Sequence, residues 1–340
     1  MNINSLVREN ILKMKPYSSA RDEFSGMDGL FLDANENPYE NGVNRYPDPY
    51  QQELKTVIAK QKGVAKENML LGNGSDEVLD LLFRAFCEPK QDSIVITAPS
   101  YGMYKVLANL NDVNYNEVRY DSDFSLDADK IIAAVDDDTK LIVLCSPNNP
   151  TGNAIPNEVI EKVLNNTNCV VVVDEAYIDF SINNSCINYL GRHNQLVVCQ
   201  TLSKYYGMAG VRLGMCFASE EVITILNRIK PPYNVNVLTQ QKAIELLKTV
   251  DNGYKKEVIS ERNRLAEELS ELSFVVKVYP SDANFLLVKT IDANAVYNQL
   301  LGQKIIIRNR TNEPLCSGCV RISIGTKEEN TALIAGLKTI

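Results

Sequence analysis

Four polar segments of this 340-residue chain follow short hydrophobic stretches that are typical of buried strands. They are Leu70–Glu77, Ser146–Gly152, Val173–Tyr177 and Gln200–Gly214. In an open parallel sheet, ligands bind beyond the carboxyl ends of the strands. If these stretches form such a sheet, side chains that are distant in the sequence meet at one edge, and any chemistry is expected there.

Asp174 and Lys204 are the two residues of these segments best suited to catalysis. Asp174 ends the hydrophobic stretch Val170–Asp174, where an unpaired carboxylate would be costly. A helix cap could satisfy it, but a cofactor cation would do so better. Lys204 follows a strand in Thr201-Leu202-Ser203-Lys204, and a lysine amine can act as a nucleophile and as a base. A single lysine is usually solvated, so the hypothesis of a catalytic site depends on the four segments together and not on Lys204 alone.

The other two segments could hold a ligand by less reactive groups. Gly74 allows close backbone approach, and the helix start at Ser75 and Asp76 offers free N–H groups to an anion. An ordinary turn capped by Ser75 or Asp76 explains the same residues. The proline-rich turn after Cys145 would place the Asn149 amide where it can bind a hydroxyl, although such clusters make turns in any protein.

Composition excludes several classes of function. The net charge of −8, with basic residues scattered, argues against a nucleic-acid partner. The only histidine, His193, lies in a polar stretch, which disfavours Ser-His-Asp and Cys-His catalysis. Cys316 and Cys319 form a lone CxxC without a second pair, so no metal site is expected. Chemistry therefore belongs to lysine, aspartate, tyrosine, arginine or a cofactor.

The chain shows no sign of export or membrane insertion. Its first 17 residues lack the apolar core of a signal peptide, and its longest aliphatic runs have the length of strands. Eight cysteines, several of them within apolar runs, are typical of a reducing compartment. These features predict a cytoplasmic protein with no membrane partner.

The hydrophobic pattern predicts an α/β fold in residues 68–218. Apolar runs without polar alternation, such as Val170–Val173, indicate a mostly parallel sheet covered on both faces. After Pro231-Pro232, two long helical patterns and shorter strands predict a smaller α+β domain. The expected division is residues 1–40 as an N-terminal segment belonging to the small domain, 41–235 as the large domain, and 236–340 as the small C-terminal domain.

The ordered motifs SPNNPTG, VDEAY and TLSK, with an arginine eight residues after the lysine, resemble the fold type I aminotransferases over nearly the whole chain. The resemblance implies pyridoxal phosphate (PLP) as cofactor, Lys204 as its Schiff-base lysine, and Asp174 as the partner of its ring nitrogen. A carboxylate about 4 Å from that nitrogen would favour the cation by roughly 4 kcal/mol at a dielectric near 20. Implied cofactor contacts are Tyr46, Gly74, Ser75, Asp76, Tyr101, Asn149, Asp174, Tyr177, Thr201, Ser203, Lys204 and Arg212.

The outer segments narrow the resemblance to histidinol-phosphate aminotransferases. Lys15–Arg21, Leu32–Pro38, Arg308–Arg310 and Ser317–Thr326 are similar to that group. The similarity implies amino transfer between L-histidinol phosphate and 2-oxoglutarate in histidine biosynthesis. Implied substrate contacts are Tyr17, Asn149, Arg308 and Arg321. Tyr46 matches a tyrosine that reaches the cofactor of the other subunit, which implies a homodimer, whereas Arg310 receives no role.

Three alternatives share parts of this pattern. An aromatic or branched-chain aminotransferase would keep every cofactor residue and differ in the outer ones. A PLP-dependent decarboxylase of a phosphorylated amino acid would need its leaving carboxylate free of an arginine, so Arg321 argues against it. A non-catalytic binding protein is disfavoured because Lys204, Asp174 and Tyr177 are all present.

Overall fold

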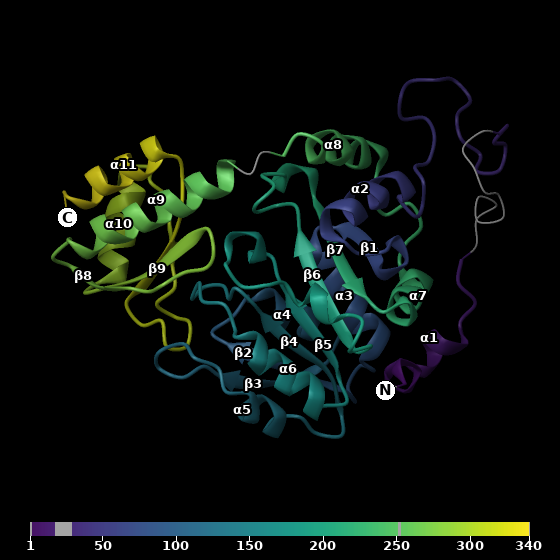
Figure 1. The fold of residues 1–340 in the computed structure, drawn as a ribbon, viewed down its shortest axis with the longest axis horizontal. Coiled ribbons are helices and arrows are strands. Elements are labelled where there is room, and N and C mark those ends of the chain that lie inside the picture. Colours follow the sequence, from purple (N-terminus) through teal and green to yellow (C-terminus); the bar gives the residue numbers. More distant parts are fainter. Residues whose placement is uncertain (1, 18–28, 251–252, 340) are drawn as a thin grey trace.

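The computed structural model describes residues 2–17, 29–250 and 253–339 and contains two sheets, each layered with helices (Figure 1). The larger sheet comprises β1 (Met69–Asn73), β2 (Ser93–Ala98), β3 (Asn114–Arg119), β4 (Thr139–Cys145), β5 (Val170–Asp174), β6 (Leu196–Thr201) and β7 (Leu213–Ala218). The associated helices are α1 (Glu9–Lys13), α2 (Gln52–Lys62), α3 (Ser75–Phe86), α4 (Met103–Leu110), α5 (Ala128–Ala133), α6 (Asn157–Asn166), α7 (Glu220–Ile229) and α8 (Val237–Leu247).

The seven strands run in the order β1-β7-β6-β5-β4-β2-β3. The pairs from β6 to β3 are parallel, whereas β7 is antiparallel to both β1 and β6. The predicted α/β class and mostly parallel sheet are therefore confirmed. Because the parallel strands share one direction, the carboxyl ends of β4, β5 and β6 lie at the same edge.

Helices cover both faces of this sheet. Along β5, Val170 and Val172 pack with α3, α4 and α7, and Val171 and Val173 pack with α2, α6 and α8. Successive strand side chains point to opposite faces, so a strand buried on both sides needs apolar residues at every position. This explains why the sequence of β5 has no polar alternation before Asp174.

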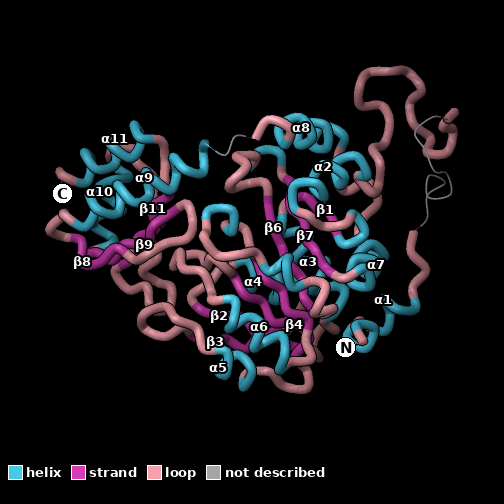
Figure 2. The backbone as a smooth tube through the Cα atoms, viewed as in Figure 1, coloured by secondary structure: helices cyan, strands magenta, loops and turns pink. Residues whose placement is uncertain are grey.

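The second sheet is antiparallel, with strand order β10-β11-β9-β8, and it packs against three helices (Figure 2). Its strands are β8 (Val275–Val278), β9 (Phe285–Thr290), β10 (Arg308–Asn309) and β11 (Cys319–Ser323). The helices are α9 (Gly253–Ser270), α10 (Ala293–Gly302) and α11 (Lys327–Leu337). Strand β10 begins only at Arg308, because the Ile305 amide donates to the Leu300 carbonyl and closes the end of α10.

Two helical segments near the expected domain boundaries pack on the large domain. Ile3, Val7 and Ile11 lie in the same hydrophobic cluster as α3 and α7, so the start of the chain packs on the large sheet and not on the small one. Helix α8 packs against α2, although the small domain was expected to begin at residue 236. In both cases an apolar helix face packs on the large domain. The local sequence pattern shows that such a face is buried but does not specify the surface that buries it.

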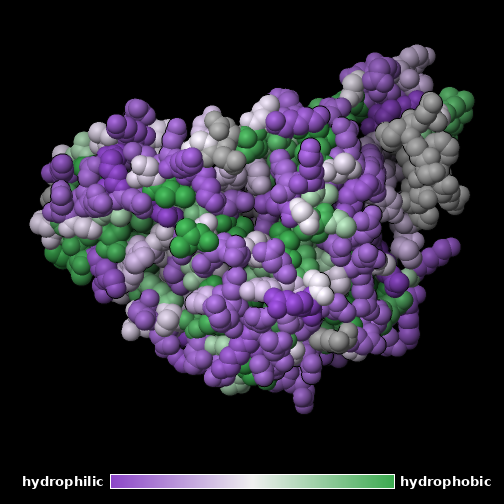
Figure 3. Space-filling view, viewed as in Figure 1, coloured by the Kyte–Doolittle hydropathy of each residue, from purple (hydrophilic) through white to green (hydrophobic). Residues whose placement is uncertain are grey.

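Residues 29–51, which precede α2, form no helix or strand and lie on the outside of the large domain (Figure 1). Leu30 and Leu32 of this segment are 86% and 80% exposed. Figure 3 shows a mainly hydrophilic face with scattered hydrophobic side chains, some of them on this segment. No helix in the described ranges is long and apolar enough to cross a membrane. All eight cysteines are buried and free.

Candidate active site

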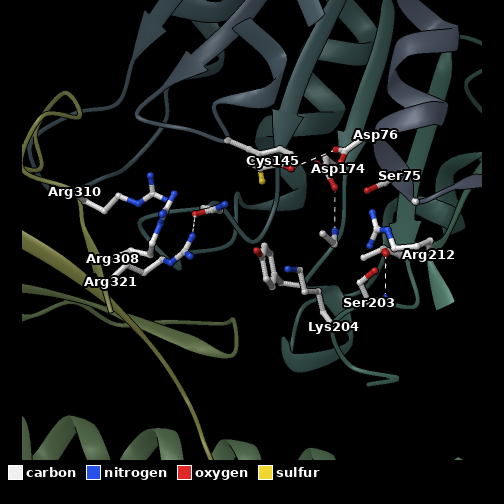
Figure 4. Close-up of a pocket in the computed structure, with 16 residues that line it drawn as sticks. Ser75, Asp76, Cys145, Asp174, Ser203, Lys204, Arg212, Arg308, Arg310 and Arg321 are labelled. Carbon is white, nitrogen blue, oxygen red and sulfur yellow. Dashed lines mark hydrogen bonds between the residues drawn. The ribbon is translucent and has the colours of Figure 1, made fainter. Parts of the chain in front are cut away.

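A cavity of about 310 Å³ opens at the edge where β4, β5 and β6 end, and the small sheet contributes its other wall (Figure 4). Every predicted site residue except Tyr17 and Tyr46 lines it, as do three residues without a predicted role. The lining residues are Gly74, Ser75, Asp76, Tyr101, Cys145, Asn149, Asp174, Ala176, Tyr177, Thr201, Ser203, Lys204, Arg212, Arg308, Arg310 and Arg321.

Asp174 is the buried acid of the cavity. Its position on β5 is two residues beyond Val172, so its side chain lies on the face of the sheet that α4 covers. Oδ2 accepts a 2.7 Å hydrogen bond from the Tyr104 hydroxyl, and Oδ1 accepts one from the Ala176 amide. Burial raises the pKa of Asp174 to about 6, against the lowering effect of these two bonds. A nearby cation would lower this pKa and stabilise the ionised form.

The start of α3 forms an anion site at one end of the cavity. Gly74 precedes the helix with φ of 76°, and the structure shows no side-chain cap on the first turn. A Cβ at Gly74 would lie 2.8 Å from Nη2 of Arg212, so only glycine lets this guanidinium approach the helix start. Free amides and a cation together suit a phosphate group.

Lys204 lies beside this anion site, in the turn that follows β6. The Ser203 amide donates to the Thr201 hydroxyl, which organises the turn. The Lys204 amine lies 5.5 Å from the centre of the Tyr177 ring. Burial lowers the pKa of Lys204, and the positive charge of Arg321 lowers it further. A smaller proton affinity increases the neutral fraction of the amine, which is the nucleophilic form.

Asn149 connects the two walls of the cavity. Its neighbour Asn148 is fully buried and fixes the turn by donating to the Pro99 carbonyl and to the Thr151 hydroxyl. The Asn149 side-chain oxygen accepts a 2.5 Å bond from Nη1 of Arg321, which belongs to the small sheet. The amide nitrogen of Asn149 is thereby oriented away from Arg321.

Tyr101 and Tyr177 provide the aromatic surfaces of the cavity. The Tyr101 hydroxyl donates to Asp76, and its ring packs edge-on against Tyr104. Burial raises the pKa of Tyr101 to about 12 and raises that of Tyr177 further. Both phenols therefore stay protonated at neutral pH and can donate hydrogen bonds to a ligand.

Two predicted residues lie outside the cavity. Tyr17 is 69% exposed, and Tyr46 is 50% exposed and stacks on Tyr233. Both belong to the extended N-terminal segment, so one chain by itself does not bring them to the ligand. Tyr104 and Arg310 had no predicted role, although the helical spacing of Tyr101 and Tyr104 and the alternate spacing of Arg308 and Arg310 could have drawn attention to them.

These groups fit pyridoxal phosphate. The anion site at Gly74 and Arg212 would take its phosphate, the Lys204 amine its aldehyde, and the buried Asp174 its ring nitrogen. Asn149 and Tyr177 would face the ring hydroxyl, and Tyr101 the ring surface. The buried Asp174 carboxylate carries this fit, because a pyridinium cation would compensate its negative charge.

Comparison with known proteins gives a consistent result. The family of class I and II aminotransferases matches residues 32–337. The chain is 55% identical to a histidinol-phosphate aminotransferase of Flavobacterium johnsoniae, covering all of this chain and 99% of that protein. It is 52% identical to the same-named protein of Flavobacterium psychrophilum, with the same coverage. The solved structure of a histidinol-phosphate aminotransferase from Clostridium acetobutylicum is 27% identical, with a TM-score of 0.79 over 87% of this chain and 90% of that one.

Proposed function

Because this chain belongs to the class I and II aminotransferase family, we propose that it transfers the amino group of L-histidinol phosphate to 2-oxoglutarate. The products would be imidazole acetol phosphate and L-glutamate, and the step belongs to histidine biosynthesis. Identity above 50% to relatives of that name, over full length, supports the substrate. The observation that carries it is the pair of arginines, Arg308 and Arg321, opposite each other in the wall that faces Lys204.

Lys204 and Asp174 perform the chemical part of this reaction. PLP supplies, when bound, a protonated ring that accepts electrons from the substrate. The ionised carboxylate of Asp174 holds the proton on that ring. The Lys204 amine, with its lowered pKa, is suited to binding the aldehyde and then to moving a proton at the substrate Cα. Tyr104 keeps the Asp174 carboxylate oriented toward the cavity.

Arg321 and Arg308 select the substrate. L-Histidinol phosphate carries a phosphomethyl group where glutamate carries its α-carboxylate, so one anion site serves both. Arg321 is anchored to Asn149 and presents a planar fork that binds carboxylate and phosphate alike. Arg308 pairs with it across two strands and makes no ion pair in the described parts of the chain. It is therefore available for the extra oxygen of a phosphate.

The same residues weigh against the alternatives. A decarboxylase must leave the departing carboxylate without a strong cationic partner, yet Arg321 is positioned to hold it. An aminotransferase for aromatic or branched-chain amino acids would need only one arginine for the α-carboxylate, and a second would be surplus. A non-catalytic role would leave the lowered pKa of Lys204 and the buried Asp174 without a purpose.

We infer that the protein is a homodimer, and the position of the N-terminal segment supports this proposal. Tyr17 and Tyr46 lie outside the cavity of their own chain on a segment with exposed apolar side chains. We infer that this segment packs on a second copy and brings Tyr46 to the partner's cofactor phosphate. We infer a cytoplasmic location, which the eight free cysteines support.

The decisive experiment measures products. The purified protein with PLP is incubated with L-histidinol phosphate and 2-oxoglutarate, and glutamate and imidazole acetol phosphate are determined by chromatography. Equal amounts of both products are expected. Carbon dioxide release without glutamate would indicate a decarboxylase. Efficient turnover of phenylalanine or leucine, with none of histidinol phosphate, would indicate another aminotransferase.

A further inference from the structure

Arg310 shares a face with Arg308 on the small sheet. The Arg310 amide donates to the Cys319 carbonyl, so the chain continues the antiparallel pairing of β10 with β11. In such a strand, residues two positions apart point to the same side. Asn309, between them, turns the other way and bonds with Asn294. Arg310 is thereby directed to the cavity together with Arg308 and Arg321, and the three lie side by side in Figure 4.

The Arg310 guanidinium is incompletely satisfied. Its Nε is buried and has no hydrogen-bond partner among the described residues, and the same holds for Nε of Arg321. Among the described residues, Arg310 forms an ion pair with Glu313 alone, at 3.5 Å from Nη1 to Oε1. A buried guanidinium donor without a partner is unfavourable unless a ligand supplies an acceptor. Arg310 itself lines the cavity.

The charges of this wall match a doubly charged ligand. Arg308, Arg310 and Arg321 line the cavity, and among described residues Glu313 alone forms an ion pair with any of them. Desolvation lowers the pKa of Arg321, and the neighbouring charges of Arg310 and Arg308 lower it further, which reflects their proximity. A carboxylate carries one negative charge, whereas a phosphate monoester carries between about 1.5 and 2 at neutral pH. One arginine balances the charge of a carboxylate but not the full charge of a phosphate monoester.

We propose that Arg310 is a third substrate-binding arginine, which recognises the second negative charge of a phosphate monoester and so separates it from carboxylate substrates. The assignment rests on the proposed function, since it concerns the phosphate of the same substrate. Arg321 binds both anions, and Arg308 and Arg310 together complete the phosphate site. Glu313 holds Arg310 in place when no phosphate is bound.

The test compares Arg310→Gln with the wild-type holoenzyme in the two half-reactions, each followed by the absorbance of the cofactor. The variant should lose about 10- to 150-fold in kcat/KM for L-histidinol phosphate, as expected for one charge-assisted contact, and only a few-fold for glutamate. Arg310→Lys should recover part of the loss because it keeps the charge without the fork. Equal losses with both substrates would overturn the proposal.

Glu313→Gln is the matched control, because it breaks the same ion pair and leaves the arginine. If Arg310 only supports the loop, this variant should reproduce the defect, and the proposal fails. If Arg310 binds phosphate, Glu313→Gln should keep or improve the reaction with histidinol phosphate.

Inorganic phosphate gives a readout that does not depend on the substrate. It should inhibit the glutamate half-reaction of the wild-type enzyme, and Arg310→Gln should weaken that inhibition about ten-fold or more. If the wild-type enzyme does not act on histidinol phosphate, the proposed function is refuted. Weaker inhibition of Arg310→Gln by inorganic phosphate would in that case still support anion binding by Arg310. Unchanged inhibition would overturn the inference alone.

Discussion

Tyr104 donates a 2.7 Å hydrogen bond to Asp174, and the two side chains are only 1% and 3% exposed. They are 70 positions apart and meet because α4 covers the face of the sheet to which Asp174 points. The bond opposes the effect of burial on the pKa of Asp174. Tyr104 is thus a positioning residue that keeps the carboxylate oriented and ionised.

Tyr104→Phe should raise the pKa of Asp174 further, since the lowering hydrogen bond is lost. A charge-assisted bond of roughly 1.5–3 kcal/mol corresponds to about one to two pKa units. The acidic limb of PLP binding to the cofactor-free protein should move to higher pH by that amount, as measured by fluorescence titration. Tyr120→Phe is the control, because Tyr120 is also buried but packs on the opposite face of the sheet. An equal shift in both variants would contradict the role of Tyr104.

Asp174→Asn should stabilise the cofactor-free protein at neutral pH. The pKa of Asp174 is about 6 in the folded protein, above its ordinary value of 3.8. A raised pKa means that the stabilising contribution is complete below pH 4 and is lost as pH rises through 6. The ionised carboxylate then opposes folding by an amount on the order of 3 kcal/mol. Urea unfolding should show the variant more stable at pH 7.5, with a difference that shrinks toward pH 4.

The same substitution should impair the enzyme once PLP is bound. A neutral amide cannot hold the ring proton, so the proton shift in stopped-flow half-reactions should slow by orders of magnitude. Near-wild-type rates would mean that Asp174 is only a structural cap. A variant that is less stable than the wild type at pH 7.5 would contradict the stability argument.

Lys204→Ala should abolish turnover and preserve the fold, because the Lys204 side chain lines the cavity and is exposed, so it is not part of the hydrophobic core. Circular dichroism should match the wild type. Borohydride treatment of the wild-type holoenzyme, followed by proteolysis and mass spectrometry, should find the cofactor on the peptide that carries Lys204. Its recovery on another lysine would exclude the assignment.

Arg308→Ala and Arg321→Ala should differ in substrate dependence. Loss of Arg308 should weaken the binding of histidinol phosphate about 10- to 150-fold and the binding of glutamate much less. Loss of Arg321 should weaken both, and Arg321→Lys should restore only part, because an ammonium lacks the planar fork. Separate half-reactions give the comparison. Equal impairment of both substrates by Arg308→Ala would favour an aromatic aminotransferase.

Tyr46 should act across a dimer interface. Mixed dimers of Tyr46→Phe and Lys204→Ala subunits contain one site in which an intact Lys204 meets the intact Tyr46 of the other chain. Mixing the two variants should therefore restore activity, with at most one active site in each mixed dimer. Sedimentation velocity should show a dimer for the wild type, whereas a fully active monomer would disprove the arrangement.

The sequence by itself was sufficient to predict which residues of the proposed reactive centre lie together. Asp174 follows an apolar strand whose neighbours are equally apolar, and a parallel sheet necessarily brings such strand ends together. Lys204, Asn149 and the glycines before Ser75 occupy the same place relative to their own strands, so local patterns were sufficient to collect them in one cavity. Their fold class followed from the same patterns.

Only the tertiary structure decided the partners of these residues. Arg310 follows the two-residue strand β10, which has no hydrophobic periodicity, and only its backbone hydrogen bond to Cys319 of β11 directs it toward Arg308 and Arg321. The bond between Tyr104 and Asp174 depends on which helix covers which face of the sheet. An apolar helix face, such as that of Ile3, Val7 and Ile11, shows in the sequence that it must be buried. The sequence does not show which surface buries this helix face, because the hydrophobic effect is non-directional.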